Sequence, residues 1–125
     1  MARTLDQQRA AFAWECACIG MKNSFSKEYK ALAKGAPALI MTSGLMPTLA
    51  FYNGKKQDAH RTLLDQVTRW LASRIWSQPL GLGQGIQTFS PFMAGLVDAD
   101  SQTYLRATDE ALEILKWIRQ FVDAV

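Results

Sequence analysis

Apolar side chains recur every three or four residues along most of the chain, the spacing that places them on one face of an α-helix. The clearest run lies between residues 57 and 77, where Leu63, Leu64, Val67, Trp70 and Leu71 follow it. No apolar–polar alternation typical of a half-buried strand extends beyond four residues. The pattern therefore predicts an all-α protein.

Capping and helix-breaking residues divide this pattern into six or seven expected helices. Thr4-Leu5-Asp6-Gln7 has the spacing of a capping box. We expect Ser26 to cap a second helix that stops at Gly35, and Pro37 to start another that ends at Ser43-Gly44. The expected helices cover approximately residues 5–21, 26–34, 37–43, 47–54, 57–77, 86–97 and 102–123.

The glycine-rich stretch Pro79–Gly85 follows a helix and not a strand, so we interpret it as a loop between helices and not as a phosphate-binding loop. Asp98-Ala99-Asp100-Ser101 is expected to cap the last helix.

The first helix carries a charge on its apolar stripe of Leu5, Phe12, Cys16 and Ile19, because Arg9 falls between Leu5 and Phe12. Two interpretations are open. Arg9 extends its guanidinium to water at the edge of the stripe, or it is a partly buried cation directed at a partner's carboxylate or phosphate.

The last helix is apolar over a wider arc than one packing neighbour requires. Either this helix is central to the bundle, or one of its two stripes covers a protein partner. One stripe holds Tyr104, Ala107, Ala111, Leu115, Ile118 and Val122, and the other holds Leu105, Leu112, Trp117 and Phe121.

Length and composition fit one domain spanning residues 1–125, with 49% hydrophobic and 20% charged residues. The longest apolar stretches fall far short of the roughly 20 residues that cross a bilayer. Charged residues interrupt the first fifteen positions, which leaves no apolar core for a signal peptide. We expect a cytoplasmic protein without membrane contact.

Charge is unevenly distributed along the chain. Residues 1–74 hold eleven Lys or Arg against five acids, a net of +6, whereas residues 75–125 hold three against six, a net of −3. The basic part is suited to phosphates or to the acidic part of another copy. Alternatively, folding mixes the two parts in space.

Several cations are candidates for phosphate contact. Lys27, Lys30 and Lys34 share one helix face, an arrangement that is more often simply solvated. Lys55 and Lys56 follow a helix end, where they also complement the helix dipole. Trp76 and Tyr52 are candidates for stacking on bases, although burial is the commoner role of such rings.

Catalytic chemistry is missing from the pattern. His60 is the only imidazole, and Cys16 and Cys18 diverge on a helix, so neither a metal site nor a disulfide is expected. Asp109 and Glu113 are spaced to hold a divalent cation, but Arg106 and Lys116 are spaced to form ordinary helix ion pairs with them. We predict no enzyme activity, no catalytic residue, no metal and no cofactor.

Three blocks of the chain resemble the small helical subunit, the fifth Cmr protein, of the type III-B CRISPR RAMP-module (Cmr) effector complex. The similarity runs in order along nearly the whole chain. The blocks are Arg9-Ala10-x-x-Ala13, Tyr29-x-x-Leu32-Ala33-x-x-Ala36-Pro37-Ala38-Leu39-Ile40-x-x-x-Gly44-Leu45-x-x-Thr48-Leu49-Ala50-Phe51-x-x-x-Lys55, and Tyr104-x-x-Ala107-Thr108-x-Glu110-Ala111-Leu112-x-x-Leu115-x-Trp117-x-x-x-Phe121.

The resemblance implies a noncatalytic structural subunit in antiviral defence. Such subunits stack in several copies as an inner filament beside the RAMP backbone subunits and the large polymerase-like subunit. A basic surface faces the duplex of guide RNA and target RNA. We expect RNA or subunit contacts from Arg9, Lys55, Lys56, Arg61 and Arg106, of which Arg9, Lys55 and Arg106 lie in or beside the similar blocks, and weaker RNA contacts from Lys27, Lys30 and Lys34.

A free-standing helical nucleic-acid-binding regulator is the alternative. It requires a recognition helix with exposed base-reading side chains. The helix of residues 57–77 offers only Gln57, Gln66 and Thr68 for that role.

Overall fold

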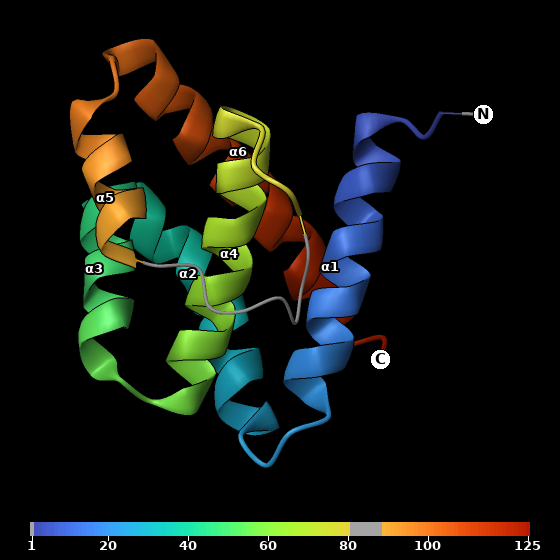
Figure 1. Ribbon diagram of the computed structural model, residues 1–125. Coiled ribbons are helices and arrows are strands. Elements are labelled where there is room, and N and C mark those ends of the chain that lie inside the picture. Colours follow the sequence, from blue (N-terminus) through green and yellow to red (C-terminus); the bar gives the residue numbers. More distant parts are fainter. Residues whose placement is uncertain (1, 81–88) are drawn as a thin grey trace.

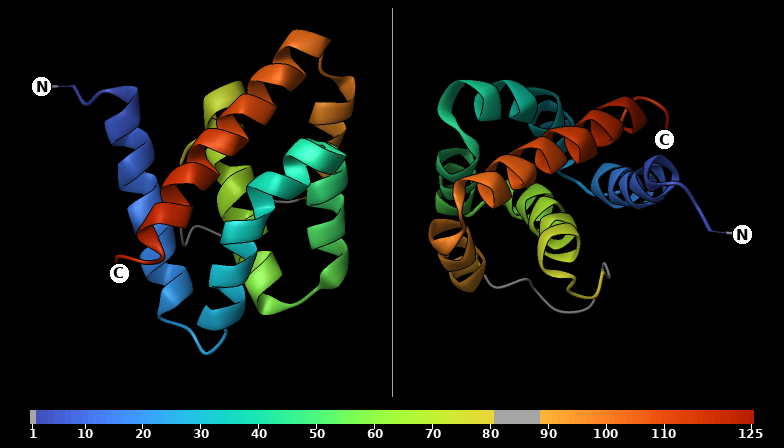
Figure 2. Two further views of the ribbon diagram at one scale, coloured as in Figure 1. Left: turned by 180° about the vertical axis from the view of Figure 1, so that it is seen from behind. Right: turned by 90° about the horizontal axis from the view of Figure 1, so that it is seen from above.

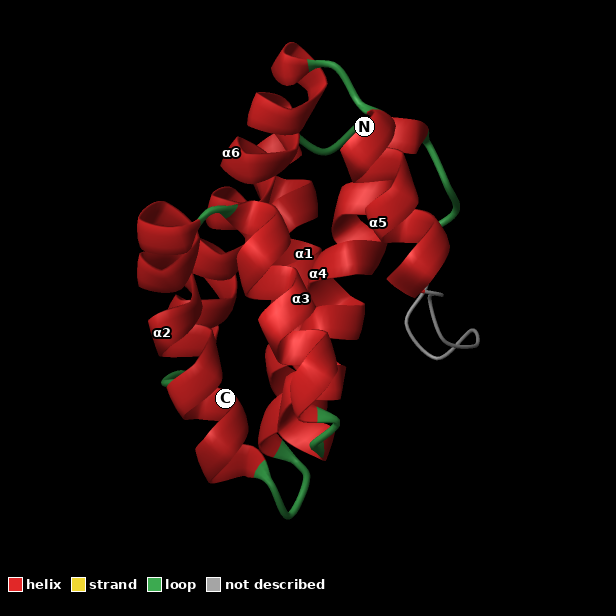
Figure 3. Cartoon of the chain, turned by 90° about the vertical axis from the view of Figure 1, so that its left-hand side faces the viewer, coloured by secondary structure: helices red, strands yellow, loops and turns green. Residues whose placement is uncertain are grey.

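Six α-helices form the regular structure of the computed structural model, which describes residues 2–80 and 89–125 (Figure 1; Figure 3). No strand occurs in these ranges, so the all-α prediction is confirmed. The helices are α1 (Leu5–Met21), α2 (Ser26–Ser43), α3 (Leu45–Lys55), α4 (Asp58–Trp76), α5 (Phe89–Asp98) and α6 (Ser101–Phe121).

Helix α6 is the centre of the bundle. It contacts α1, α2 and α4, and the view from above shows it running diagonally between α1 and α4 on one side and α2 and α3 on the other (Figure 2). Ala107, Ala111, Ile114 and Ile118 are fully buried along it. The second apolar stripe is covered only in part, and Leu105 is 61% exposed. A central position therefore explains most of the wide apolar arc.

Local capping fixes the starts of α1 and α6. In α1 the Thr4 N–H donates to Gln7 Oε1 (2.8 Å) and the Gln7 N–H donates to Thr4 Oγ1 (3.1 Å), which completes the expected capping box. In α6 the Thr103 N–H donates to Asp100 Oδ1 (2.7 Å), and this bond lowers the pKa of Asp100. Both helices begin where the sequence predicts.

Helices α1 and α2 meet where Gly20 faces the ring of Tyr29. The Tyr29 side chain is fully buried, and its hydroxyl lies within hydrogen-bonding distance of Gln66 and of the Cys16 carbonyl. The buried face of α1 turns toward this ring, so Ile19, expected on the buried stripe, is 38% exposed. Because Gly20 has no Cβ, the Tyr29 ring packs closely against it, and this contact determines which face of α1 is covered.

Helix α2 continues through Gly35 and Pro37, so the predicted break between two helices is wrong. Tyr29, Ala33, Ala36 and Ile40 are all buried and keep helical spacing on both sides of the glycine. Their continuous burial offsets the cost of glycine and proline inside a helix, about 1 and 3 kcal/mol respectively. Ser26 makes no capping bond, and the N-cap is Phe25.

The next helix boundaries agree with the pattern to within a few residues. Gly44 ends α2 with φ 96°, as expected of a glycine. Helix α3 starts at Leu45, before Pro47, and passes through Asn53-Gly54, which were expected to end it. The left-handed residue after α3 is Lys56, with φ 56°.

The remaining expectations concern α4, α5 and the glycine-rich segment. Helix α4 occupies nearly all of residues 57–77, and Trp70 is buried as expected of a core residue. The helix expected over residues 86–97 corresponds to α5. Residues 81–88, which include most of the glycine-rich stretch, lie outside the described residues. Within the described ranges, no helix has the length and apolar character needed to span a membrane.

We predict that Gly20→Ala lowers the free energy of unfolding by about 1–3 kcal/mol, because the added methyl overlaps Cε1, Cδ1 and Cζ of the buried Tyr29 ring. Denaturant unfolding followed by circular dichroism measures the change.

Gly35→Ala is the matched control. It lies inside α2, and an added Cβ meets no atom within 4 Å. We expect it to stabilise the protein by about 0.5–1 kcal/mol, the difference in helix propensity. Equal stability of the two variants would contradict the packing described at Gly20.

Candidate nucleic-acid interface

The guanidinium of Arg9 is held within the chain by the carboxylate of Glu110. Nε and Nη2 donate to the two carboxylate oxygens over 2.9 and 3.0 Å, a bidentate pair, and Nη1 donates to Asp6 (3.0 Å). The Arg9 side chain is 15% exposed. The structure thus shows a partly buried cation directed at a carboxylate, and that carboxylate belongs to α6 of the same chain.

Glu110 joins three helices. Besides Arg9 from α1, the indole Nε1 of Trp70 on α4 donates to its Oε1 (2.9 Å). Burial raises the pKa of Glu110, but the hydrogen bonds from Arg9 and Trp70 outweigh burial, so the pKa lies below its ordinary value. The carboxyl group is therefore ionised and fully engaged at neutral pH.

Two lysines of the α2 stripe are paired with the C-terminal end of the chain. Lys30 Nζ and Lys34 Nζ each lie 2.9 Å from the Asp123 carboxylate. Their hydrogen bonds lower the pKa of Asp123. Lys27 is exposed and forms no ion pair within the described residues.

Folding therefore mixes much of the charge that is separated along the sequence. Glu110 and Asp123, acids of the negative part, are paired with Arg9, Lys30 and Lys34 of the positive part. The cations that remain without internal partners, and not the total charge of a half, decide where the basic surface lies.

Three predicted contact residues come together at the connection between α3 and α4. Lys55 is the last residue of α3, Lys56 follows it in the left-handed conformation, and Arg61 lies one turn into α4. All three are exposed, and no ion pair involves them in the part of the chain that the structure describes. We call Lys55, Lys56 and Arg61 the turn cluster.

Arg106 is not part of this cluster. It is exposed on α6, and its Nη2 donates to the carbonyl oxygen of Arg74 (2.8 Å), near the C-terminal end of α4. Arg61 and Arg74 are separated by thirteen residues of that helix, about 20 Å along its axis. The predicted contact residues thus lie at opposite ends of α4.

The two aromatic rings proposed for base stacking are mostly covered. Tyr52 is buried, and Trp76 packs against the ring of Phe92 with centroids 5.6 Å apart. The exposed ring at this position is the neighbour of Tyr52, Phe51, which the sequence analysis missed. Its spacing of four residues from Lys55 on a helix was the available signal.

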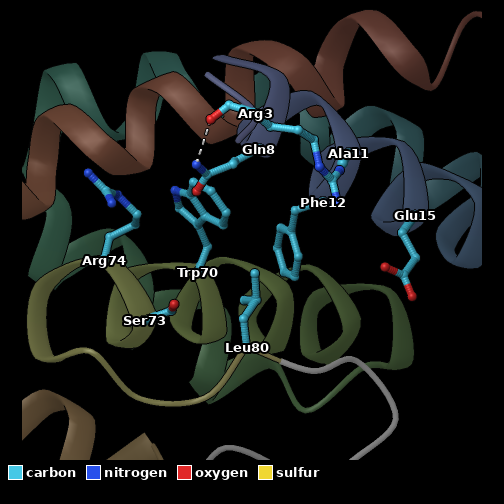
Figure 4. Close-up of a pocket in the computed structure, with 9 residues that line it drawn as sticks. All are labelled: Arg3, Gln8, Ala11, Phe12, Glu15, Trp70, Ser73, Arg74 and Leu80. Carbon is cyan, nitrogen blue, oxygen red and sulfur yellow. Dashed lines mark hydrogen bonds between the residues drawn. The ribbon is translucent and has the colours of Figure 1, made fainter. Parts of the chain in front are cut away.

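A groove of about 630 Å³ lies between α1 and α4 (Figure 4). Phe12 and Trp70 form its floor, with ring centroids 5.3 Å apart, but both rings are almost completely covered. Arg3 and Glu15, of opposite charge, lie among its lining residues. The groove therefore offers a mixed polar rim and not an open stacking surface or a uniformly basic one.

Only one of the two ion pairs expected for the acidic pair on α6 is present in the described residues, because Arg106 donates to Arg74 and does not pair with Asp109. Asp109 is exposed, and Glu113 lies 3.6 Å from Lys116. Within the described ranges, no group of three or more His, Cys, Asp or Glu side chains is placed to hold a metal ion.

The imidazole and the thiols are placed in packed surroundings. The His60 ring meets the Tyr52 ring edge-on at 5.5 Å, and burial followed by the charge of Lys55 lowers the pKa of His60. Cys16 and Cys18 are free thiols, as expected, and burial raises the pKa of Cys16, which keeps it protonated.

These features define an all-α bundle in which three exposed cations without ion pairs in the described residues lie together at one inter-helix turn. The chain is similar to known proteins over nearly its whole length. Residues 5–125 match the sequence model of the family described as "CRISPR-associated protein (Cas_Cmr5)". The "CRISPR system Cmr subunit Cmr5" of Thermus thermophilus is 26% identical over 123 residues, covering 98% of this chain and 96% of that protein.

A crystal structure of a CRISPR-associated Cmr5 family protein from Thermus thermophilus has the same fold. The TM-score is 0.77 at 27% identity, with 98% of this chain and 97% of that chain covered. The chain belongs to the Cmr5 family of CRISPR-associated proteins, and the resemblance found in the sequence is confirmed.

We predict that Glu110→Gln lowers the free energy of unfolding at pH 7 by about 2–4 kcal/mol, because it leaves the partly buried Arg9 without its carboxylate. The folded-state pKa of Glu110 is below the ordinary 4.5, so its stabilisation is complete above that value and is lost as the pH falls through the lower pKa. The stability difference between the two proteins should therefore shrink below pH 4.5 in denaturant titrations.

Asp6→Asn provides the control, since Asp6 contacts the same guanidinium but its side chain is 68% exposed. We expect a change below about 1 kcal/mol. If Glu110→Gln changes the free energy of unfolding as little as this, or by an amount that does not vary with pH, the stabilising role assigned to the bonds of Glu110 with Arg9 and Trp70 is wrong.

Proposed function

We propose that this protein is a noncatalytic structural subunit of a type III-B CRISPR (Cmr) RNA-guided effector complex. In this role several copies stack as an inner filament beside the RAMP backbone subunits and the large polymerase-like subunit. The observation that carries the proposal is the family match over residues 5–125, together with a Thermus relative named as a Cmr subunit.

The turn cluster is the part of the surface best suited to contact the phosphates of the guide RNA–target RNA duplex. Lys55, Lys56 and Arg61 are exposed and close in sequence, and they have no acidic partner within the described residues. Phosphate contacts of this kind position RNA without reading its sequence. Arg106 serves the same role at the other end of α4.

The remaining candidates have smaller roles in the proposal. Arg9 is engaged by Glu110 and Asp6, so we assign it support of the fold beneath any interface and not direct phosphate contact. Lys30 and Lys34 already share Asp123, which leaves Lys27 as the available cation of that stripe. These three lysines remain second choices for RNA contact.

A structural role is also supported by what surrounds the reactive side chains. His60 packs against the Tyr52 ring, and Cys16 is buried. Asp109 belongs to no group of three or more His, Cys, Asp or Glu side chains placed to hold a metal ion in the described residues. We therefore propose that the reactions of the complex take place on other subunits.

The free-standing regulator loses support from the structure. Of the three base-reading candidates on the helix of residues 57–77, Gln66 and Thr68 are buried, and only Gln57 is exposed. With two of the three candidates buried, this helix has little with which to read a major groove.

We expect the tagged chain, expressed with the rest of its CRISPR system, to copurify with RAMP-type subunits, the large subunit and guide RNA. Mass spectrometry of the purified material and sequencing of its RNA provide the measurement. Recovery of the chain alone, from cells that contain the other subunits, would contradict the proposal.

We predict that replacing Lys55, Lys56 and Arg61 together by alanine reduces the salt slope of RNA-target binding by the reconstituted complex by roughly 2 to 3. Each phosphate contact contributes about 0.7–0.9 to that slope. Dissociation constants measured across a range of salt concentrations give the slope.

A triple variant at Lys22, Lys116 and Arg119 removes the same charge from exposed positions that are not candidates. Its slope should match that of the unmodified complex. If both triple variants change the slope equally, the turn cluster has no specific role in phosphate contact.

A further inference from the structure

Phe51 is one of two aromatic side chains that are exposed in the described ranges. It is 53% exposed, and the other, Trp14, is 45% exposed. The Trp14 ring packs edge-on against Phe121 with centroids 5.1 Å apart. The Phe51 ring lies tilted against the Tyr52 ring with centroids 6.1 Å apart, and the Lys55 ammonium lies over the Phe51 ring, 4.9 Å from its centroid. An exposed ring with a cation over it is thus found at one of the two positions, and a base can stack on the ring face that the lysine leaves uncovered.

The residue that follows α3, five positions after Phe51, has a left-handed backbone, as Ser77 has at the end of α4. Lys56 has φ 56°, a left-handed conformation that is unfavourable for a residue with a Cβ. Asn53 and Gly54, which adopt this conformation more easily, lie within α3 and do not take it. The chain therefore places a lysine where glycine would relieve strain, and such strain is often found at functional sites.

The cations around Phe51 form no ion pair in the described residues, and they outnumber the one acid of the same segment, Asp58. Arg9, Lys30 and Lys34 have carboxylate partners, whereas the turn cluster has none in the described part of the chain. Two buried polar atoms without a hydrogen-bond partner, Tyr52 OH and His60 Nδ1, also lie in the segment between Phe51 and Arg61. Polar groups and cations are thus gathered here beyond what the fold uses.

An exposed ring flanked by free cations has the components of a single-strand nucleotide site. Bases stack on aromatic side chains, and adjacent cations hold the backbone phosphates. A paired base is stacked between its neighbours and leaves no face for a protein ring, so the ligand must be unpaired.

We propose that Phe51 stacks against an unpaired RNA base while Lys55, Lys56 and Arg61 bind the phosphates on either side of it. This inference rests on the proposed contact with RNA and specifies the RNA element that the turn cluster holds, an unpaired nucleotide and not only a duplex backbone. Stacking accepts any base, so the site has no strong sequence preference.

The test compares single-stranded and double-stranded RNA of the same length, about ten nucleotides, binding to the purified full-length protein. Fluorescence anisotropy at several salt concentrations gives the dissociation constant and its salt slope. The variants are Phe51→Leu, Phe51→Tyr, and Trp14→Leu as the matched exposed aromatic away from the turn cluster. Circular dichroism checks that each variant is folded.

We expect Phe51→Leu to weaken binding to single-stranded RNA about 5-fold to 100-fold, since one stacked base contributes about 1–3 kcal/mol. Its salt slope should be unchanged because no charge is removed, and its binding to duplex RNA should be unchanged as well. Phe51→Tyr keeps an aromatic face and should bind like the unmodified protein, as should Trp14→Leu.

The inference is overturned if Phe51→Leu binds single-stranded RNA as well as the unmodified protein does, or if it loses duplex binding equally. Undetectable binding of the unmodified protein to single-stranded RNA at millimolar concentration overturns it too. If Phe51→Leu instead blocks incorporation into the Cmr complex with RNA binding intact, the ring meets a neighbouring protein and the inference is wrong.

The same titration separates this inference from the proposed function. The alanine variant of the turn cluster should lower the salt slope whether or not a base stacks on Phe51. If the salt slope falls in that variant but Phe51→Leu has no effect, the phosphate contacts are supported and the stacked base is ruled out.

Discussion

The buried carboxylate of Glu110 is the constraint on which the arrangement of the bundle depends. It lies on α6, the central helix, and receives hydrogen bonds from Arg9 of α1 and Trp70 of α4. A buried charge is tolerated only where partners satisfy it, so α1 and α4 have to approach α6 at the positions that supply these donors. Apolar contacts along α6 allow some sliding, whereas a bidentate ion pair admits one register.

The ion pairs that stabilise the bundle also shape its electrostatic surface. Arg9, Lys30 and Lys34 are used within the chain, where they neutralise Glu110 and Asp123. The turn cluster forms no ion pair in the described residues, and Lys55 lies over the Phe51 ring. The net charge of +3 is thus a poor guide to the surface, because part of the positive charge counted along the sequence is paired with acids within the fold.

Membership of the Cmr5 family agrees with a molecule that works through its shape and surface. Its reactive side chains are packed or dispersed in the described residues, while the turn cluster and its most exposed aromatic ring lie at the connection between α3 and α4. A small bundle held in register by a buried ion pair presents such a surface with little rearrangement, as the proposed contact with RNA requires.

The sequence by itself determined the all-α class, the capped starts of α1 and α6, the buried Trp70 and the family, because capping and helical periodicity depend on residues within a few positions of one another. It did not determine that α2 continues through Gly35 and Pro37, since that outcome depends on what Ala36 and Ile40 meet on other helices. Nor did it identify the partner of Arg9, a carboxylate 101 residues away. Tertiary packing decided which cations form no ion pair, and it decided that Phe51 and not Tyr52 faces solvent. Burial and pairing are properties of the assembled helices and not of any local pattern.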